Sequence, residues 1–214
     1  MSVIRQPGVL GRTTRRRVVG VTAALSAAVV EAAAVGLWFS LVVGSRSTST
    51  ALAGLGILFC GSLLRAGVFG ATVSELGDLL QPRRLIVAVL LTGSWVVWLL
   101  AAERIGGGTG IVVATVVLAG ILTGQLFLER RVFRLRARSK RARTSLVPAL
   151  LLAVGASLLL ASAWLTDWTV ATPQLSFEGI SLIVRIEAVQ IGVLVFGLFA
   201  FLAHQRRFER LLDP

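Results

Sequence analysis

Four ionisable residues lie inside stretches that are otherwise apolar, and they are the best candidates for chemistry in this chain. They are Glu31, Arg65, Arg185 and Glu187. An ionisable side chain at the centre of a bilayer costs roughly 2.5–3.5 kcal/mol on insertion scales. A membrane protein retains such residues where they are paired, hydrated or used. Each of the four therefore marks a candidate functional position.

Glu31 and Arg65 fall at similar depths in two consecutive apolar segments. Measured from the end that the segments share, Glu31 lies about 18 Å deep and Arg65 about 21 Å deep, at 1.5 Å per residue. A short connection around Arg46 should make the two segments antiparallel neighbours, so we predict a buried ion pair. The pair either has a structural role or makes Glu31 a protonatable transport site that Arg65 adjusts.

Arg185 and Glu187 are only two residues apart, so on a helix their side chains would not meet. We expect Arg185 to be an interfacial arginine that extends toward the headgroups. Glu187 would share a helical face with Gln190 and form a short polar stripe. This stripe should either line a pore or binding site or make hydrogen bonds between helices. For Gln125 we expect a packing hydrogen bond.

The composition places these residues in a membrane protein. The 214 residues are 56% hydrophobic and 15% charged, whereas soluble domains contain roughly 25% charged residues. Lipid offers no partner to backbone polar groups, so spans of roughly 20 apolar residues should be helices. The sequence predicts one all-α integral membrane domain, a bundle of six transmembrane helices. Their approximate limits are 18–43, 51–73, 85–102, 111–128, 146–165 and 180–203.

The distribution of basic residues predicts the orientation. They gather in the N-terminal tail, the second and fourth connections and the C-terminal tail, while the other connections contain only Arg46 and Arg104. The positive-inside rule then puts both termini in the cytoplasm, N-in and C-in. Five tryptophans fall toward the opposite ends of the spans, where we expect them among lipid headgroups. They are Trp38, Trp95, Trp98, Trp164 and Trp168.

A basic cytoplasmic loop is predicted over residues 129–144. We expect it to attract anionic lipid headgroups, at about 1 kcal/mol per basic residue near the surface. Apart from Phe133 it lacks the interleaved aromatic residues of a nucleic-acid site, so no nucleic-acid partner is expected. Its basic residues are Arg130, Arg131, Arg134, Arg136, Arg138, Lys140, Arg141 and Arg143.

The sequence lacks the residues that several kinds of catalytic and cofactor site require. Cys60 is the only cysteine and His204 the only histidine, so we expect no metal site and no cofactor such as a bis-histidine haem. No nucleophile elbow and no phosphate-binding glycine loop is present. These absences argue against an enzyme.

Small residues recur every fourth position in the first apolar segment, at Ala24, Ala28, Ala32 and Gly36. This spacing places them on one helix face and allows close helix packing, within one protomer or against a partner. The partner would be a second copy of the chain or another membrane subunit.

Two functions remain open for this chain, which we expect in the plasma membrane of a prokaryote. One is a small transporter or channel, with Glu31, Glu187 and Gln190 around one interior cavity. The other is a non-catalytic membrane subunit or scaffold, with the same residues in dry and satisfied contacts.

Overall fold

Six long helices make up most of the protein. The structure, a computed structural model, describes residues 7–45, 47–73, 82–132, 143–166, 168–171, 173, 175–177, 180–182 and 185–212. The helices are α1 (Pro7–Gly44), α2 (Thr48–Val73), α3 (Pro82–Ile105), α4 (Gly107–Val132), α5 (Arg143–Trp164) and α6 (Ala188–Leu212). Each is long and apolar enough to cross a membrane, which confirms the predicted number and type of spanning elements.

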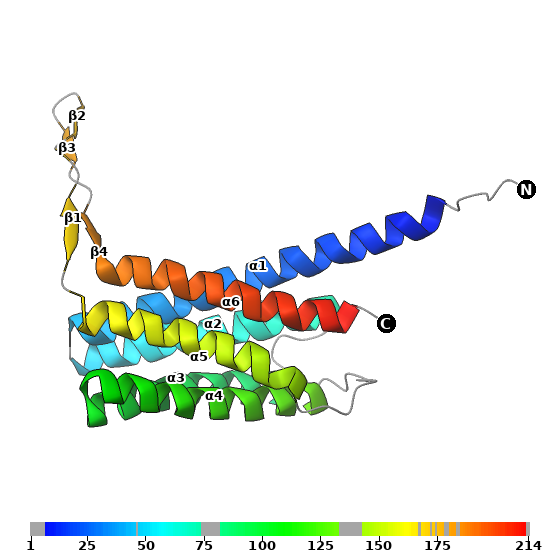
Figure 1. Ribbon diagram of the computed structural model, residues 1–214, viewed down its shortest axis with the longest axis horizontal. Coiled ribbons are helices and arrows are strands. Elements are labelled where there is room, and N and C mark those ends of the chain that lie inside the picture. Colours follow the sequence, from blue (N-terminus) through cyan, green and yellow to red (C-terminus); the bar gives the residue numbers. More distant parts are fainter. Residues whose placement is uncertain are drawn as a thin grey trace, which may run out of the picture.

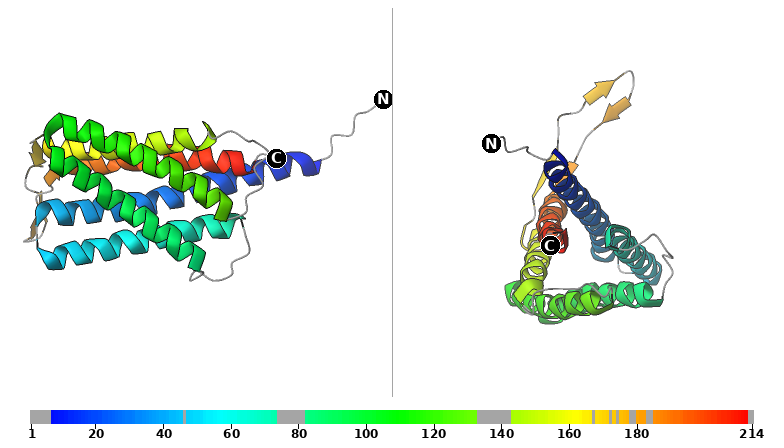
Figure 2. Two further views of the ribbon diagram at one scale, coloured as in Figure 1. Left: turned by 90° about the horizontal axis from the view of Figure 1, so that it is seen from below. Right: turned by 90° about the vertical axis from the view of Figure 1, so that its right-hand side faces the viewer.

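The helices run up and down and close into a ring. Each packs against the helix before and after it in the chain, and α6 packs against α1. Viewed end-on, they enclose a triangular outline (Figure 2, right). The start of α1 and the end of α6 lie at the same end of the ring (Figure 1), which we call the inner end. The opposite end, where α1 meets α2, is the outer end.

Glycines permit the closest helix contacts. A β-carbon added to Gly36 would lie 2.8 Å from Cγ1 of Val193, and one added to Gly192 would collide with the Ser162 hydroxyl. Ala24 and Ala28 are also buried. The small-residue face of α1 therefore packs within the protein, on the side that meets α6.

An aromatic layer fills the ring below its outer end. It consists of Phe39, Trp95, Trp98 and Phe196, each at most 1% exposed. Trp95 meets Phe196 edge-on, with ring centroids 5.5 Å apart, and meets Trp98 in the same way at 5.7 Å. The layer lies about 8–15 Å below the outer ends of its helices, at 1.5 Å per residue.

The aromatic layer corrects the expectation for three tryptophans. Trp38, Trp95 and Trp98 are buried in the bundle rather than placed among headgroups, because they lie on the inward faces of α1 and α3. Trp168, which lies outside the helices, is 44% exposed.

The segment between α5 and α6 forms a β-ribbon at the outer end (Figure 1). β1 (Thr169–Ala171) pairs antiparallel with β4 (Arg185–Glu187), and β2 (Leu175–Phe177) pairs with β3 (Ile180–Leu182). The prediction that the sixth span begins at residue 180 is therefore wrong. Within each of the two strands β3 and β4, apolar and polar residues alternate with a period of two, and the helix begins only at Ala188.

Candidate functional site: a buried ion network and an outer pocket

The structure brings Glu31 of α1 and Arg65 of α2 into contact. Nη1 of Arg65 lies 3.3 Å from Oε1 and 3.5 Å from Oε2 of Glu31. Each residue is only 3% exposed. The two helices are antiparallel neighbours, so residues that lie at similar depths in the sequence also lie at similar depths in the fold.

His204 of α6 is a second partner of Glu31. Its Nε2 atom lies 2.6 Å from Oε2 of Glu31, and the imidazole is fully buried. Because an ionised carboxylate only accepts hydrogen bonds, this contact favours the form of His204 that carries a hydrogen on Nε2. The only histidine of the chain is thereby oriented by a charge in the interior of the bundle.

Glu129 of α4 extends the contacts across the ring. Its Oε1 atom lies 3.1 Å from Nη2 of Arg65, and its Oε2 atom lies 2.6 Å from Nη2 of Arg207. The main packing partners of α4 are α3 and α5, so these contacts reach across to α2 and α6. The five residues form a closed circuit through α6, α1, α2 and α4, which we call the ion network.

The ion network balances its own charge. Two carboxylates face two guanidinium groups, and each carboxylate oxygen accepts at least one hydrogen bond. Pairing of this kind offsets much of the cost of placing charges in a low-dielectric interior. Four helices are thus tied together by charge-assisted contacts, which are stronger than neutral hydrogen bonds.

Sequence reasoning missed three members of the network. Glu129 is the first residue of the predicted basic loop, Arg207 belongs to the basic C-terminal tail, and His204 was considered only as a ligand of a metal or haem. One signal was present, because His204 and Arg207 are three residues apart and share a helix face. Glu129 is also the only acidic residue in its basic stretch.

The cavity that the described residues form beside Glu31 and Arg65 is small. A cavity of about 10 Å³ touches Glu31, Arg65 and Trp95. A water molecule needs at least about 10–15 Å³ by this measure, so the cavity holds one water at most. Glu31 therefore has room for at most one water molecule in this cavity.

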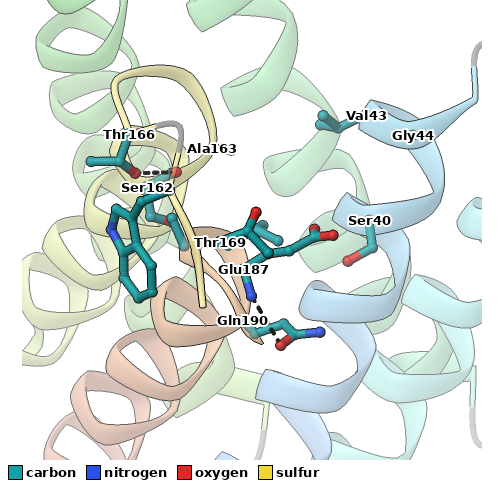
Figure 3. Close-up of a pocket in the computed structure, with 12 residues that line it drawn as sticks. Ser40, Val43, Gly44, Ser162, Ala163, Thr166, Thr169, Glu187 and Gln190 are labelled. Carbon is teal, nitrogen blue, oxygen red and sulfur yellow. Dashed lines mark hydrogen bonds between the residues drawn. The ribbon is translucent and has the colours of Figure 1, made fainter. Parts of the chain in front are cut away.

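A much larger pocket opens at the outer end, between α1, α5, α6 and the β-ribbon. Its volume is about 560 Å³. We call it the outer pocket, and Figure 3 shows its lining. The lining residues are Ser40, Val43, Gly44, Ser162, Ala163, Thr166, Trp168, Thr169, Glu187, Ala188, Val189 and Gln190.

Glu187 and Gln190 line this pocket, whereas Glu31 lies far below it. Both residues are exposed, and the backbone N–H of Glu187 donates to Oε1 of Gln190 at 3.3 Å. This contact caps the start of α6, because a glutamine at the third helical position reaches back to the residue before the helix. The predicted polar stripe on a helix is therefore a strand residue and a helix cap.

Arg185 lies in β4 and is exposed, outside the helical spans. In a strand, residues two apart project from the same face, so Arg185 and Glu187 share a face, unlike on the expected helix. Neither is an intramembrane charge of a spanning helix. The physical reason is the start of α6 at Ala188, after both residues.

The remaining predicted polar positions are Gln125 and the basic loop. Gln125 joins α4 to α3, accepting from the Ser94 hydroxyl at 3.3 Å and donating to the Val87 carbonyl at 3.4 Å.

In the basic loop, Arg134, Arg136, Arg138, Lys140 and Arg141 lie outside the described residues, as do the side chains of Arg130, Arg131 and Arg143. The predicted binding of lipid headgroups stays a prediction.

Among the residues that the structure describes, no group of three histidine, cysteine or acidic side chains could hold a metal ion. The candidate site thus has two separate parts, a closed ion network and an open polar pocket. Comparisons with protein-family models, with curated proteins and with solved structures found no match for the chain.

Proposed function

We propose that this chain is a small membrane transporter that admits a polar solute to the outer pocket and is closed at its inner end by the ion network. The observation that carries the proposal is the order of the layers along the ring. A polar pocket comes first, a dry aromatic layer second and a balanced set of charges third. A transporter closed toward one side requires such a sequence of site and barrier.

The pocket has the dimensions of a binding site. Its volume of about 560 Å³ falls within the roughly 300–1,000 Å³ of small-molecule sites. Its walls belong to three helices and to the ribbon, so movement of α6 against α1 would change its shape. A site at the meeting point of several elements suits a solute that is bound and then released.

The ion network suits a reversible closure. It lies about 20 Å (Glu31) to 33 Å (Glu129) below the outer ends of its helices, at 1.5 Å per residue, so it fills the inner part of the ring. Separated charges regain hydration when water enters, which lowers the cost of opening relative to a dry interface. The circuit also couples α4 and α6, so opening one contact loosens the others.

The proposed orientation follows the basic residues. Both termini would be cytoplasmic in a prokaryotic plasma membrane, with the outer pocket on the external side and the basic loop against anionic headgroups. A cysteine in place of the exposed Arg206 should then react with a membrane-impermeant maleimide only from the cytoplasmic face. Reaction from the external face alone would reverse the orientation.

The closure is tested by cysteine accessibility in a Cys60→Ala background. Leu58 is buried in α2 between the aromatic layer and the network. In inverted membrane vesicles, Leu58→Cys should react slowly with an impermeant maleimide. Adding Arg207→Gln should speed the reaction at least about tenfold, because the network then loses the contact between α6 and α4.

Arg206→Gln is the matched control, since Arg206 precedes Arg207 but is exposed. It should leave the labelling rate of Leu58→Cys unchanged. Cysteines at positions 187 and 190 should react from the external face. Equal labelling of position 58 in all backgrounds would show that the network is no closure, and unreactive cysteines at 187 and 190 would remove the pocket from the proposal.

The alternative function is a non-catalytic membrane subunit. Dry and satisfied contacts at Glu31 and Arg65 favour it, because interhelical attachment needs nothing more from them. Gly120 and Gly124 on α4 are exposed, and a β-carbon added to either would meet nothing within 4 Å, so a partner helix could approach there. In that case Gly120→Leu would dissociate a larger assembly on a native gel, and no network variant would change labelling at position 58.

A further inference from the structure

We propose that the outer pocket binds a small organic cation that carries N–H donors, such as a primary ammonium group. This inference names the solute class for the proposed transport function and rests on it. It is drawn from the charge, the hydrogen-bonding state and the position of the lining side chains.

The charge of the lining has one sign. Among the described residues that line the pocket, Glu187 is the only one with an ionisable side chain. Its side chain extends from the end of β4 toward Ser40 of α1 (Figure 3). Within the part of the chain that the structure describes, no ion pair with Glu187 is found. Its carboxylate is thus available to a ligand with positive charge.

Three of the four hydroxyl groups among the described lining residues reinforce this preference. Ser40 donates its hydroxyl hydrogen to the Gly36 carbonyl at 2.8 Å, and Ser162 donates to the Leu159 carbonyl at 2.7 Å. Thr166 donates in the same way to the Ser162 carbonyl. A hydroxyl has one hydrogen and two lone pairs, so these groups can offer a ligand only acceptors.

The lining therefore matches a donor-rich cation and disfavours an anion. The carboxylate would accept a charge-assisted hydrogen bond, and Trp168 adds an aromatic ring at the rim of the pocket. Gln190 accepts from the Glu187 backbone and keeps its amide N–H donors for an oxygen of the ligand. A hard metal cation prefers several oxygen ligands with more than one carboxylate, which this lining lacks.

Three probes of similar shape test the charge preference. Equilibrium binding of benzylammonium, benzyl alcohol and benzoate would be measured on the full chain in phospholipid nanodiscs. Benzylammonium should bind saturably, and the neutral and anionic probes should bind at least about tenfold more weakly. Equal binding of the three probes, or no saturable binding of benzylammonium, would overturn the inference.

Two variants test the position of the site. Glu187→Gln should weaken benzylammonium binding about 10- to 100-fold, because it replaces a charged acceptor by a neutral one of the same shape. Glu103→Gln is the matched control, since Glu103 is exposed near the outer end of α3 and does not line the pocket. Equal effects of the two substitutions would refute a site at Glu187.

Uptake into vesicles separates this inference from the proposed transport. Glu187-dependent binding without uptake of benzylammonium would contradict transport and retain the cation site. Uptake that is equal in the native protein and Glu187→Gln would contradict the cation site and retain transport. Glu187→Asp, which keeps the charge, should retain most of the binding.

Discussion

The ion network and the outer pocket use similar side chains under opposite conditions. Each contains a glutamate and each involves α1 and α6, yet Glu31 is 3% exposed with partners on two helices, while the Glu187 carboxylate faces an open pocket. In the network, the charged groups pair with one another in the interior of the bundle. The pocket presents one charge and several acceptors to solvent. Position along the ring, and not residue type, therefore separates the buried, paired glutamate from the exposed one.

The largest effect should come from removing the central cation of the network. Arg65→Gln leaves the buried carboxylates of Glu31 and Glu129 without their shared partner. Breaking a buried ion pair on one side costs about 3–5 kcal/mol. We expect a large drop in the thermal unfolding temperature of the purified protein and in its abundance in the membrane.

The double substitution Glu31→Gln/Arg65→Gln should recover part of this loss. It removes one charge of each sign and leaves Glu129 paired with Arg207. Native stability of Arg65→Gln alone would show that the network contributes little to holding the four helices together.

Adjacent arginines provide the next comparison. Arg207→Gln should destabilise the protein by about 1–3 kcal/mol, because the buried Glu129 keeps only one cationic partner. Arg206→Gln should leave the unfolding temperature unchanged, since Arg206 is exposed. Chemical or thermal unfolding of both variants in the same detergent measures the difference, and equal unfolding temperatures would contradict it.

The wall of the outer pocket can be tested by its packing. A β-carbon at Gly192 would strike the Ser162 hydroxyl at the contact of α5 and α6, so Gly192→Ala should cost about 1–3 kcal/mol. Gly120→Ala, with nothing within 4 Å of the added atom, should be neutral or stabilising by up to about 1 kcal/mol. Thermal unfolding of the two variants measures the difference in stability. Similar losses of stability in both would mean that close packing does not define this wall.

The smallest effect on stability is expected at Glu187. The same change, glutamate to glutamine, should lower the unfolding temperature at position 31 and leave it unchanged at position 187. Glu31 accepts from Arg65 and His204 in the interior, whereas the carboxylate of Glu187 faces the outer pocket. Differential scanning fluorimetry of both variants measures this contrast. A clear loss of stability in Glu187→Gln would mean that the pocket carboxylate has a structural partner.

Particular residues show how far sequence reasoning reached. Glu31 and Arg65 could be related to each other because consecutive spans are antiparallel neighbours and depth can be counted along a helix. Counting depth along consecutive spans could not show that Glu129 and Arg207 belong to the same network. Their contacts cross the ring between helices that are not consecutive, and nothing in a linear pattern states which helix faces meet there.

Two other predictions that the structure corrects concern the segment before α6 and the tryptophans. Residues 180–182 and 185–187 fall within the predicted span, but each triplet alternates between apolar and polar residues and pairs with an earlier strand, β2 and β1 respectively, which makes them strands. Trp95 and Trp98 lie near a span end, as headgroup residues do, yet they are buried within the ring. Hydrophobicity alone does not distinguish a spanning helix from an apolar strand, or a tryptophan at the headgroups from one inside the bundle.

The sequence by itself determined six spanning helices and the presence of charges within them, because lipid forces the backbone to satisfy its own hydrogen bonds within apolar segments of fixed length. Beyond the predicted pair of Glu31 and Arg65, only the tertiary structure decided which charges share a site. Closure of the ring turned Glu31, Arg65, Glu129, His204 and Arg207 toward one another and left Glu187 at the outer end. The physical reason is that ion pairing depends on distances between helices, which the order of residues along one helix does not contain.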